Sequence, residues 1–147
     1  MSKYRVLIAD DNIANVELLE AYLSGCGYDI ATAADGAETL VMAETFEPNL
    51  ILLDIMMPKL SGFEVCEELK SNPQTRGIMI LMVTALTELG DIERAVSAGC
   101  NDYLSKPVNK AELLKRVENL LTLQSVTDEL SRLKKYIDKT EDSYGPQ

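Results

Sequence analysis

Five polar residues of this chain could together carry out phosphoryl chemistry. Each follows or ends a short apolar segment, and they are Asp10, Asp11, Asp54, Thr84 and Lys106. Carboxylates that lie close together repel one another, and a hard divalent cation such as Mg²⁺ relieves that repulsion through oxygen ligands. The cation and Lys106 would neutralise the oxygens of a phosphoryl group, and the Thr84 hydroxyl would donate a hydrogen bond to one of them. Asp54 is then the expected nucleophile toward phosphorus.

Taken one at a time, these residues have simpler explanations. An acidic pair after a strand commonly caps a helix or solvates a loop, and Asp54 alone could cap the turn before Pro58. Thr84 alone is a β-branched residue at the end of a strand, and Lys106 alone is a surface lysine. These explanations do not account for three carboxylates and one ammonium gathered at one apolar edge. Whether the residues gather there depends on the elements that carry them.

Short apolar segments alternate with segments of helical periodicity along the chain. Strands are expected at residues 4–9, 28–33, 50–53, 78–83 and 101–104. Helices are expected at about residues 13–23, 36–46, 62–71 and 88–98, with a last helix that begins at Val108 or Asn109. Five strands that alternate with five helices predict a doubly wound α/β fold, in which a parallel sheet carries helices on both faces.

The predicted fold brings the five polar residues together. In an open α/β sheet, ligands bind at the carboxyl ends of the parallel strands, where the strand order reverses. The acidic pair follows the first strand, Asp54 the third and Lys106 the fifth, while Thr84 ends the fourth. All five are therefore expected at one edge of the sheet.

Composition excludes several classes of function. The 147 residues suit a single domain, and 14 basic against 24 acidic residues give a net charge of −10. Such a chain is repelled by nucleic-acid phosphates and by anionic lipids, so neither nucleic acid nor a membrane is an expected partner. The chain contains no His. This absence excludes imidazole-based zinc sites, Ser-His-Asp and Cys-His catalysis, and a phosphohistidine carrier.

The cysteines and the N-terminal segment indicate a cytoplasmic protein. Cys26, Cys66 and Cys100 are odd in number and far apart, so we expect buried small side chains in a reducing compartment and no disulfide framework. The N-terminal residues lack the pattern of a signal peptide, and no apolar run approaches the length of a transmembrane helix.

Over roughly residues 3–122 the chain resembles the receiver domain of bacterial two-component response regulators. The matching segments are VLIADDN at 6–12, LILLDIMMPKLSG at 50–62, VTA at 83–85 and DYLSKPV at 102–108. The resemblance implies a flavodoxin-like (βα)5 fold with strand order 2-1-3-4-5. It also implies a phosphoacceptor signalling domain and not an enzyme with a separate substrate. Its phosphoryl donor would be the phosphohistidine of a histidine kinase or phosphotransfer protein, or a small phosphodonor, and its output a contact with a downstream protein.

The resemblance implies a metal site made of side chains and one backbone group. Asp10 and Asp11 look like the acidic pair around Mg²⁺, with Asp11 as the more direct ligand and Mn²⁺ as a substitute metal. Asp54 looks like the phosphorylated residue and a further ligand. The backbone carbonyl of Met56 would complete the ligands that the protein provides.

The resemblance also implies a switch. Thr84 looks like the hydroxyl that moves toward the phosphoryl group, and Tyr103 like the aromatic residue that then turns inward. Tyr103 could instead be an ordinary half-buried strand residue. Lys106 looks like the lysine of the family motif, and its bond to Pro107 is expected to be cis.

The residues that border the expected path of hydrolytic water are apolar. Met56 and Leu86 follow Asp54 and Thr84 by two positions each, and neither can orient a water molecule through a carboxylate or an amide. We therefore expect the chain to lose its phosphoryl group slowly by itself.

Two other functions compete with a stand-alone receiver. The chain could be the regulatory receiver of a longer effector such as a diguanylate cyclase, because its last helix continues through Leu121 as a connector would. Against this, the residues that follow are too few for an effector domain. A phosphatase of the haloacid-dehalogenase type would need a second carboxylate two residues after Asp54, where this chain has Met56, and is rejected.

The last helix is expected to extend beyond the receiver, which we assign to residues 1–121. In the extension, 122–147, apolar residues follow steps of 3, 4, 3 and 4, and they are Leu123, Val126, Leu130, Leu133 and Ile137. This heptad pattern predicts a coiled coil and a homodimer, although a solvated helical tail is the alternative. The polar end, from Thr140 to Gln147, is expected to be disordered.

Overall fold

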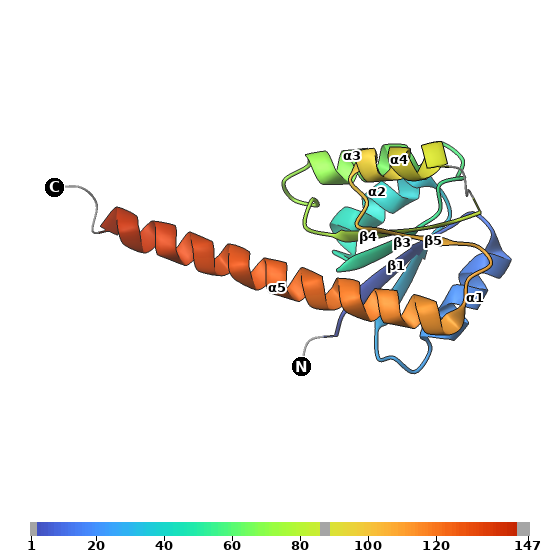
Figure 1. Ribbon diagram of the computed structural model, residues 1–147, viewed down its shortest axis with the longest axis horizontal. Coiled ribbons are helices and arrows are strands. Elements are labelled where there is room, and N and C mark those ends of the chain that lie inside the picture. The colour runs from blue at the N-terminus through green and yellow to red at the C-terminus, as the bar shows by residue number, and fades with distance from the viewer. Residues whose placement is uncertain (1–2, 86–88, 144–147) are drawn as a thin grey trace.

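Five short strands form the sheet that the alternating sequence pattern predicts. The computed structural model describes residues 3–85 and 89–143. The strands are β1 (Arg5–Ala9), β2 (Asp29–Ala33), β3 (Leu50–Leu53), β4 (Met79–Thr84) and β5 (Asp102–Ser105). They lie in the order β2-β1-β3-β4-β5, and every neighbouring pair is parallel (Figure 1). The predicted doubly wound, flavodoxin-like fold is confirmed.

The helices begin at side chains that suit a helix N-terminus. They are α1 (Ile13–Leu23), α2 (Gly36–Thr45), α3 (Gly62–Ser71), α4 (Leu89–Ala98) and α5 (Lys110–Ser143). Asn12, Asp35 and Ser61 cap the first three, and each accepts a hydrogen bond from the backbone N–H three residues further on. Ser61 also belongs to a capping box, in which Glu64 reaches back to the Ser61 N–H.

Helices cover both faces of the sheet (Figure 1). On one face, α1 and the first part of α5 pack on the strands through Leu19, Leu23 and Leu113. On the other face, α2, α3 and α4 form a second core that includes Phe63 and Ala95. Every residue of β3 and β4 is buried, because these inner strands are covered on both sides.

The C-terminal helix is longer than the sequence pattern predicted. Residues 140–143 were expected in a disordered tail, yet α5 runs without a break to Ser143. The segment Thr-Glu-Asp-Ser contains neither Gly nor Pro, and the first such residue is Gly145. The remainder of the expected tail, 144–147, lies outside the described residues. Figure 1 shows α5 projecting far beyond the domain.

Element ends differ slightly from the predicted ones. The strand ladder between β4 and β5 pairs Thr84 with Ser105, so both strands end one residue later than expected. The last helix begins at Lys110, after the predicted start at Val108 or Asn109. These shifts arise because pairing across the sheet, which is not a local property, sets where strands end.

One cysteine departs from the expectation of burial. Cys66 is buried and Cys100 is partly buried, but Cys26 is exposed. Cys26 lies in the turn after α1, between Gly25 and Gly27, whose φ angles of 86° and 82° suit glycine. All three are free thiols.

None of the described helices has both the length and the apolar character needed to cross a bilayer.

Candidate functional site

The structure gathers the predicted site residues at the carboxyl ends of the strands. β1 and β3 are neighbours, and the Asp54 N–H donates to the Ala9 carbonyl at 3.0 Å, which places Asp10 and Asp54 side by side. β4 and β5 are neighbours as well, and the Lys106 N–H donates to the Thr84 carbonyl at 2.9 Å. Strand pairing therefore sets the backbone position of each candidate site residue.

Lys106 links the two buried carboxylates of the site. Its Nζ lies 3.0 Å from Asp10 Oδ2 and 3.2 Å from Asp54 Oδ2. Asp10 and Asp54 are only 3% and 7% exposed, whereas the Lys106 side chain is 20% exposed. One ammonium thus partly neutralises two carboxylates that water hardly reaches, and the site keeps an excess of negative charge.

The pKa values of the site reflect this arrangement. Burial raises the pKa of the Asp54 carboxyl above its ordinary value, the Lys106 charge opposes the rise, and the Asp10 charge adds to it. Burial alone would lower the pKa of Lys106, but its hydrogen bonds and charge interactions with Asp10 and Asp54 raise it. The carboxylates therefore favour the charged form of Lys106, whereas burial disfavours the charged form of Asp54 unless positive charge is close by.

A third carboxylate completes an acidic cluster that can hold a metal ion. One oxygen from each of Asp10, Asp11 and Asp54 lies within 4.8 Å of the other two. Asp11 is exposed, so the cluster opens to solvent on its side. Asp10 Oδ1 also accepts the Asn12 N–H at 2.9 Å, which holds that carboxylate in place. An all-oxygen set of this kind fits a hard divalent cation.

Met56 lies beside Asp54 in the loop that follows β3. Its backbone N–H donates to Asp54 Oδ1 at 3.2 Å, and its side chain is exposed. On the other side of the site, the peptide bond between Lys106 and Pro107 is cis. Leu86, the second apolar residue expected to border the site, lies outside the described residues.

The two expected switch residues have different surroundings. Thr84 is completely buried at the end of β4. Tyr103 packs against the core formed with α2, α3 and α4. Within the described part of the chain, its buried hydroxyl has no hydrogen-bond partner, and burial raises the pKa of this phenol.

The loop after Asp54 is held by contacts that the sequence did not reveal. The Gly36 N–H donates to the Pro58 carbonyl at 3.4 Å, and Lys59 Nζ lies 3.3 Å from Asp35 Oδ2. A β-carbon on Gly36 would lie 2.4 Å from the Leu60 carbonyl oxygen, so only glycine permits this close approach. The Asp-Gly pair is recognisable as the start of a helix. No local sequence pattern shows that Asp35 and Gly36 contact the loop after Asp54.

Comparison with known proteins gives one family. The sequence model of the response regulator receiver domain matches residues 6–118. Response regulator PleD of Caulobacter vibrioides is 44% identical over 126 residues, which cover 86% of this chain and 28% of PleD. Several further relatives are named as transcriptional regulators. The chain spans about half, or less, of the length of the curated relatives it matches.

Solved structures show the same fold. A CheY-like receiver domain protein from Methanospirillum hungatei JF-1 has a TM-score of 0.80 and 32% identity, over 86% of this chain and 99% of the other. The receiver domain of the sensor histidine kinase PA1611 from Pseudomonas aeruginosa PAO1 has a TM-score of 0.76 and 32% identity, over 82% of this chain and 99% of the other. The latter structure contains a magnesium ion coordinated in its active-site cleft.

Proposed function

Because the chain belongs to the family of response regulator receiver domains of two-component signalling, we propose that it accepts a phosphoryl group on Asp54. The donor is the phosphohistidine of a histidine kinase or phosphotransfer protein, or a small phosphodonor. The observation that carries this proposal is the position of Asp54, which shares one lysine with Asp10 and lies in the acidic cluster. A lone structural aspartate would not need such neighbours.

The acidic cluster would hold Mg²⁺, or Mn²⁺ in its place. Asp10, Asp11 and Asp54 would provide side-chain oxygens, and Met56 its backbone carbonyl. The excess negative charge at this edge of the sheet supports a cation there, as does the magnesium site of the Pseudomonas relative. When bound, the metal neutralises carboxylate and phosphoryl oxygens, which otherwise repel one another.

The chain's own residues account for the transfer step. A carboxylate oxygen of Asp54 attacks phosphorus in line, and the O–P bond forms as the bond from phosphorus to the donor's imidazole nitrogen breaks. The electron pair stays on that nitrogen, which takes a proton from solvent. The Met56 N–H donates to Oδ1 of Asp54 and so orients the carboxylate. Lys106 neutralises charge on the phosphoryl oxygens. The domain thus promotes its own phosphorylation and acts on no separate substrate.

The signal would leave the site through Thr84 and Tyr103. Thr84 lies at the strand end next to that of Asp54, where its hydroxyl can donate to a phosphoryl oxygen, and Tyr103 follows it inward. The buried, unpaired hydroxyl of Tyr103 among the described residues fits a side chain with a second position. The resulting surface change would alter binding to a downstream protein. Exposed Met56 beside Asp54 cannot orient water, so the phosphoryl group is lost slowly.

We place this function in the cytoplasm, where the kinase presents its phosphohistidine. Three free thiols suit a reducing compartment. The net charge of −10 disfavours direct contact of this chain with nucleic acid or a membrane. The partners are therefore proteins.

A second candidate is the regulatory receiver of a longer effector, such as a diguanylate cyclase. The observation that favours it is the small share of PleD that the chain spans, 28%, together with the extension of α5 past the domain. The mass of the native protein in cells, measured with an antibody against this chain, separates the two candidates. A species of the mass of this chain supports the stand-alone receiver.

The phosphoacceptor proposal is tested by chemical phosphorylation. The chain is incubated with acetyl phosphate or phosphoramidate and Mg²⁺, and the modified residue is mapped by mass spectrometry. We expect one phosphoryl group on Asp54, which EDTA prevents and Asp54→Asn abolishes. Labelling that persists in the Asp54→Asn chain would refute the assignment.

A further inference from the structure

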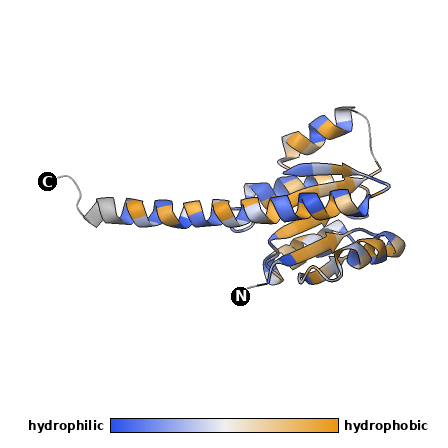
Figure 2. Ribbon diagram, turned by 60° about the horizontal axis from the view of Figure 1, so that its bottom comes forward, coloured by the Kyte–Doolittle hydropathy of each residue, from blue (hydrophilic) through white to orange (hydrophobic). Residues whose placement is uncertain are grey.

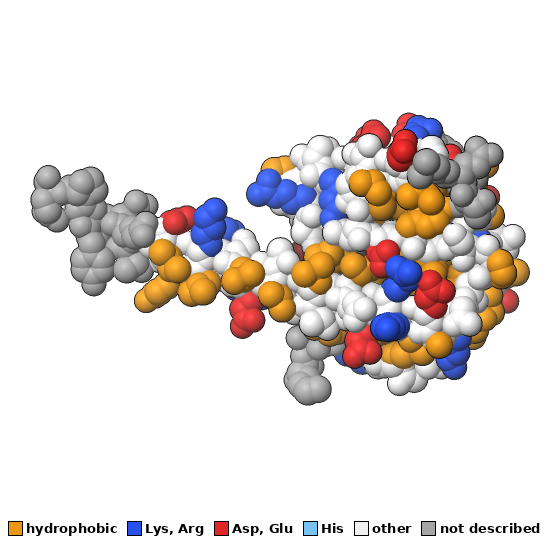
Figure 3. All heavy atoms as spheres, viewed as in Figure 1, with side chains coloured by type: hydrophobic (Ala, Val, Ile, Leu, Met, Phe, Trp, Pro, Cys, Tyr) orange, Lys and Arg blue, Asp and Glu red, His pale blue; other side chains and the backbone are white. Residues whose placement is uncertain are grey.

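The apolar side of α5 changes along its length. In the part that packs on the sheet, the buried apolar side chains are Leu113, Val117, Leu120 and Leu121. Beyond them, apolar side chains with exposures between 46% and 60% form what we call the apolar stripe, which consists of Leu123, Val126, Leu130, Leu133 and Ile137. Figure 2 shows apolar residues recurring along the projecting helix, and Figure 3 shows them gathered along one side.

The apolar stripe lies on a different side of α5 from the packed residues. Successive residues turn by about 100° around a helix axis, so the middle of the stripe is about 145° from the middle of the packed set. The chain's own domain cannot cover the stripe, because it already lies against the other side.

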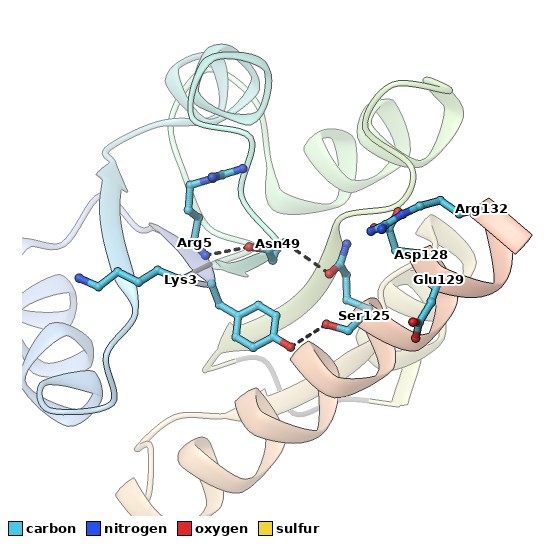
Figure 4. Close-up of a pocket in the computed structure, with 9 residues that line it drawn as sticks. Lys3, Arg5, Asn49, Ser125, Asp128, Glu129 and Arg132 are labelled. Atoms are coloured by element: carbon cyan, nitrogen blue, oxygen red, sulfur yellow. Dashed lines mark hydrogen bonds and ion pairs between the residues drawn. The ribbon is translucent and has the colours of Figure 1, made fainter. Parts of the chain in front are cut away.

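Contacts beyond Leu121 hold the packed side of the helix against the domain. The Tyr4 hydroxyl lies 2.6 Å from Ser125 Oγ, and Asn49 Nδ2 donates to Gln124 Oε1 at 3.3 Å (Figure 4). An open pocket of about 410 Å³ adjoins these contacts. Asp128, one turn further along the helix, also lines it. These contacts determine the rotation of α5 where it leaves the domain, and they turn the apolar stripe away from it.

We propose that the apolar stripe binds the same stripe of a second copy of this chain, in a parallel two-helix coiled coil. The steps of 3, 4, 3 and 4 residues place the stripe at the a and d positions of successive heptads. A single chain leaves these side chains in water, which is unfavourable, and pairing buries them. The pairing is independent of the phosphoacceptor proposal, because no residue of the stripe belongs to that site.

Charges beside the stripe favour the parallel arrangement. With Leu130 at an a position, Glu129 occupies the g position before it and Lys134 the e position of the following turn. In a parallel coiled coil these positions of the two helices adjoin, so Glu129 of each copy faces Lys134 of the other. An antiparallel pair aligned on the same seam would place Glu129 beside Tyr136, and Lys134 beside Thr127. Only the parallel pair joins opposite charges twice.

Self-association is measured by sedimentation equilibrium of the full chain. We expect a concentration-dependent dimer that Leu130→Lys weakens by about tenfold or more, because it places a charge in an apolar contact. Ser131→Lys adds the same charge at an exposed position outside the stripe and should leave association unchanged. A monomer at every concentration would overturn the proposal, as would a trimer or tetramer, or a dimer that tolerates Leu130→Lys.

The charge pairs are tested by reversal. Glu129→Lys and Lys134→Glu should each weaken the dimer several-fold, because each brings like charges together. The chain with both substitutions should recover the association, since the opposite charges face each other again. Residues five positions apart do not meet within one helix, so recovery reports a contact between chains. A double variant weaker than either single variant would refute the parallel pairing.

Disulfide trapping tests the orientation. The exposed thiol is first removed by Cys26→Ser, and this chain should stay uncrosslinked under mild oxidation. Addition of Ile137→Cys should then give a covalent dimer, because parallel helices place each residue beside its own copy. If the Ile137→Cys chain crosslinks only to a chain with Val126→Cys, the helices are antiparallel and the proposed arrangement is wrong.

Discussion

A β-carbon built on Gly62 would lie 2.4 Å from the backbone carbonyl oxygen of Asp54. It would also lie 2.7 Å from the Ile55 α-carbon, and the Gly62 N–H donates to the Ile55 carbonyl at 2.9 Å. Helix α3 therefore starts directly against the backbone of the proposed phosphoacceptor. Backbone atoms cannot give way as the end of a flexible side chain can, so this contact requires glycine.

Gly62→Ala should destabilise the fold and slow phosphorylation of Asp54. The added methyl group must push α3 or the end of β3 aside, which costs about 1–3 kcal/mol of the free energy of unfolding. The displaced Asp54 backbone would also move the carboxylate away from Lys106. Urea unfolding gives the loss of stability, and the rate of labelling by phosphoramidate gives the loss of function.

Gly90→Ala is the matched control for this prediction. Gly90 also lies in the first turn of a helix, but nothing is within 4 Å of its would-be β-carbon. Alanine is the better helix former, so this change should raise the free energy of unfolding by about 0.5–1 kcal/mol. Equal effects of the two substitutions would show that Gly62 is not sterically constrained.

Lys106→Ala should destabilise the metal-free chain more than the metal-bound chain. The substitution leaves Asp10 and Asp54 buried without their shared ammonium, and loss of one partner from such a cluster costs about 3–5 kcal/mol. A divalent cation supplies positive charge to the same carboxylates. Thermal unfolding in EDTA and in excess Mg²⁺ should therefore show a deficit that Mg²⁺ partly restores.

Lys115→Ala serves as the control, because Lys115 is an exposed helical residue without an ion pair in the described part of the chain. It should change stability little in either solution.

Circular dichroism of Lys106→Ala should remain that of a folded protein, while its response to a phosphoryl mimic is impaired. A normal response would contradict the role of Lys106.

Asp54→Asn should stabilise the metal-free chain at neutral pH. Burial raises the pKa of Asp54 on folding, so the folded chain binds the carboxyl proton more tightly than the unfolded chain does. The protonated carboxyl therefore contributes to the free energy of unfolding at low pH, and this contribution is lost as the pH rises through the raised pKa. At pH 7 the ionised carboxylate therefore costs stability that asparagine does not. In EDTA, we expect the variant to have the higher free energy of unfolding at pH 7, and the difference to shrink toward pH values below about 4. A difference that does not change with pH would argue against this electrostatic origin.

The three thiols should react at very different rates. Cys26 is exposed, whereas burial, with a contribution from Cys100, raises the pKa of Cys66 to about 12. The thiolate is the reactive form, and at pH 8 it makes up only about 10⁻⁴ of a thiol with that pKa. Iodoacetamide should modify Cys26 first, and Cys26→Ser should remove the fast reaction. Rapid labelling of Cys66 in the native chain would show that its helix opens.

The sequence alone determined the order of the elements and the convergence of the site. Apolar runs such as Leu50–Leu53 are local patterns, and local patterns decide which segments become strands or helices. Once five strands alternate with five helices, the strands are expected to be parallel, and their carboxyl ends place Asp10, Asp54 and Lys106 at one edge. These conclusions needed no knowledge of distances.

Only the tertiary structure decided how the site residues meet. That one ammonium contacts both Asp10 and Asp54, and that glycine is required at Gly36 and Gly62, depends on backbone segments that are distant in sequence. The exposure of Cys26 depends in the same way on the turn that carries it out of the core. Such contacts arise from packing of whole elements, which periodicity does not encode.

For the last helix, too, some features can be predicted from the sequence and others only from the tertiary structure. The heptad steps from Leu123 to Ile137 are legible in the sequence, and so is the apolar face from Leu113 to Leu120. That α5 remains helical to Ser143, and that the domain holds one side of it while the apolar stripe faces away, became evident only in the structure. Periodicity shows that a helix has an apolar side, but the packing of the helix on its domain decides which side stays in solvent.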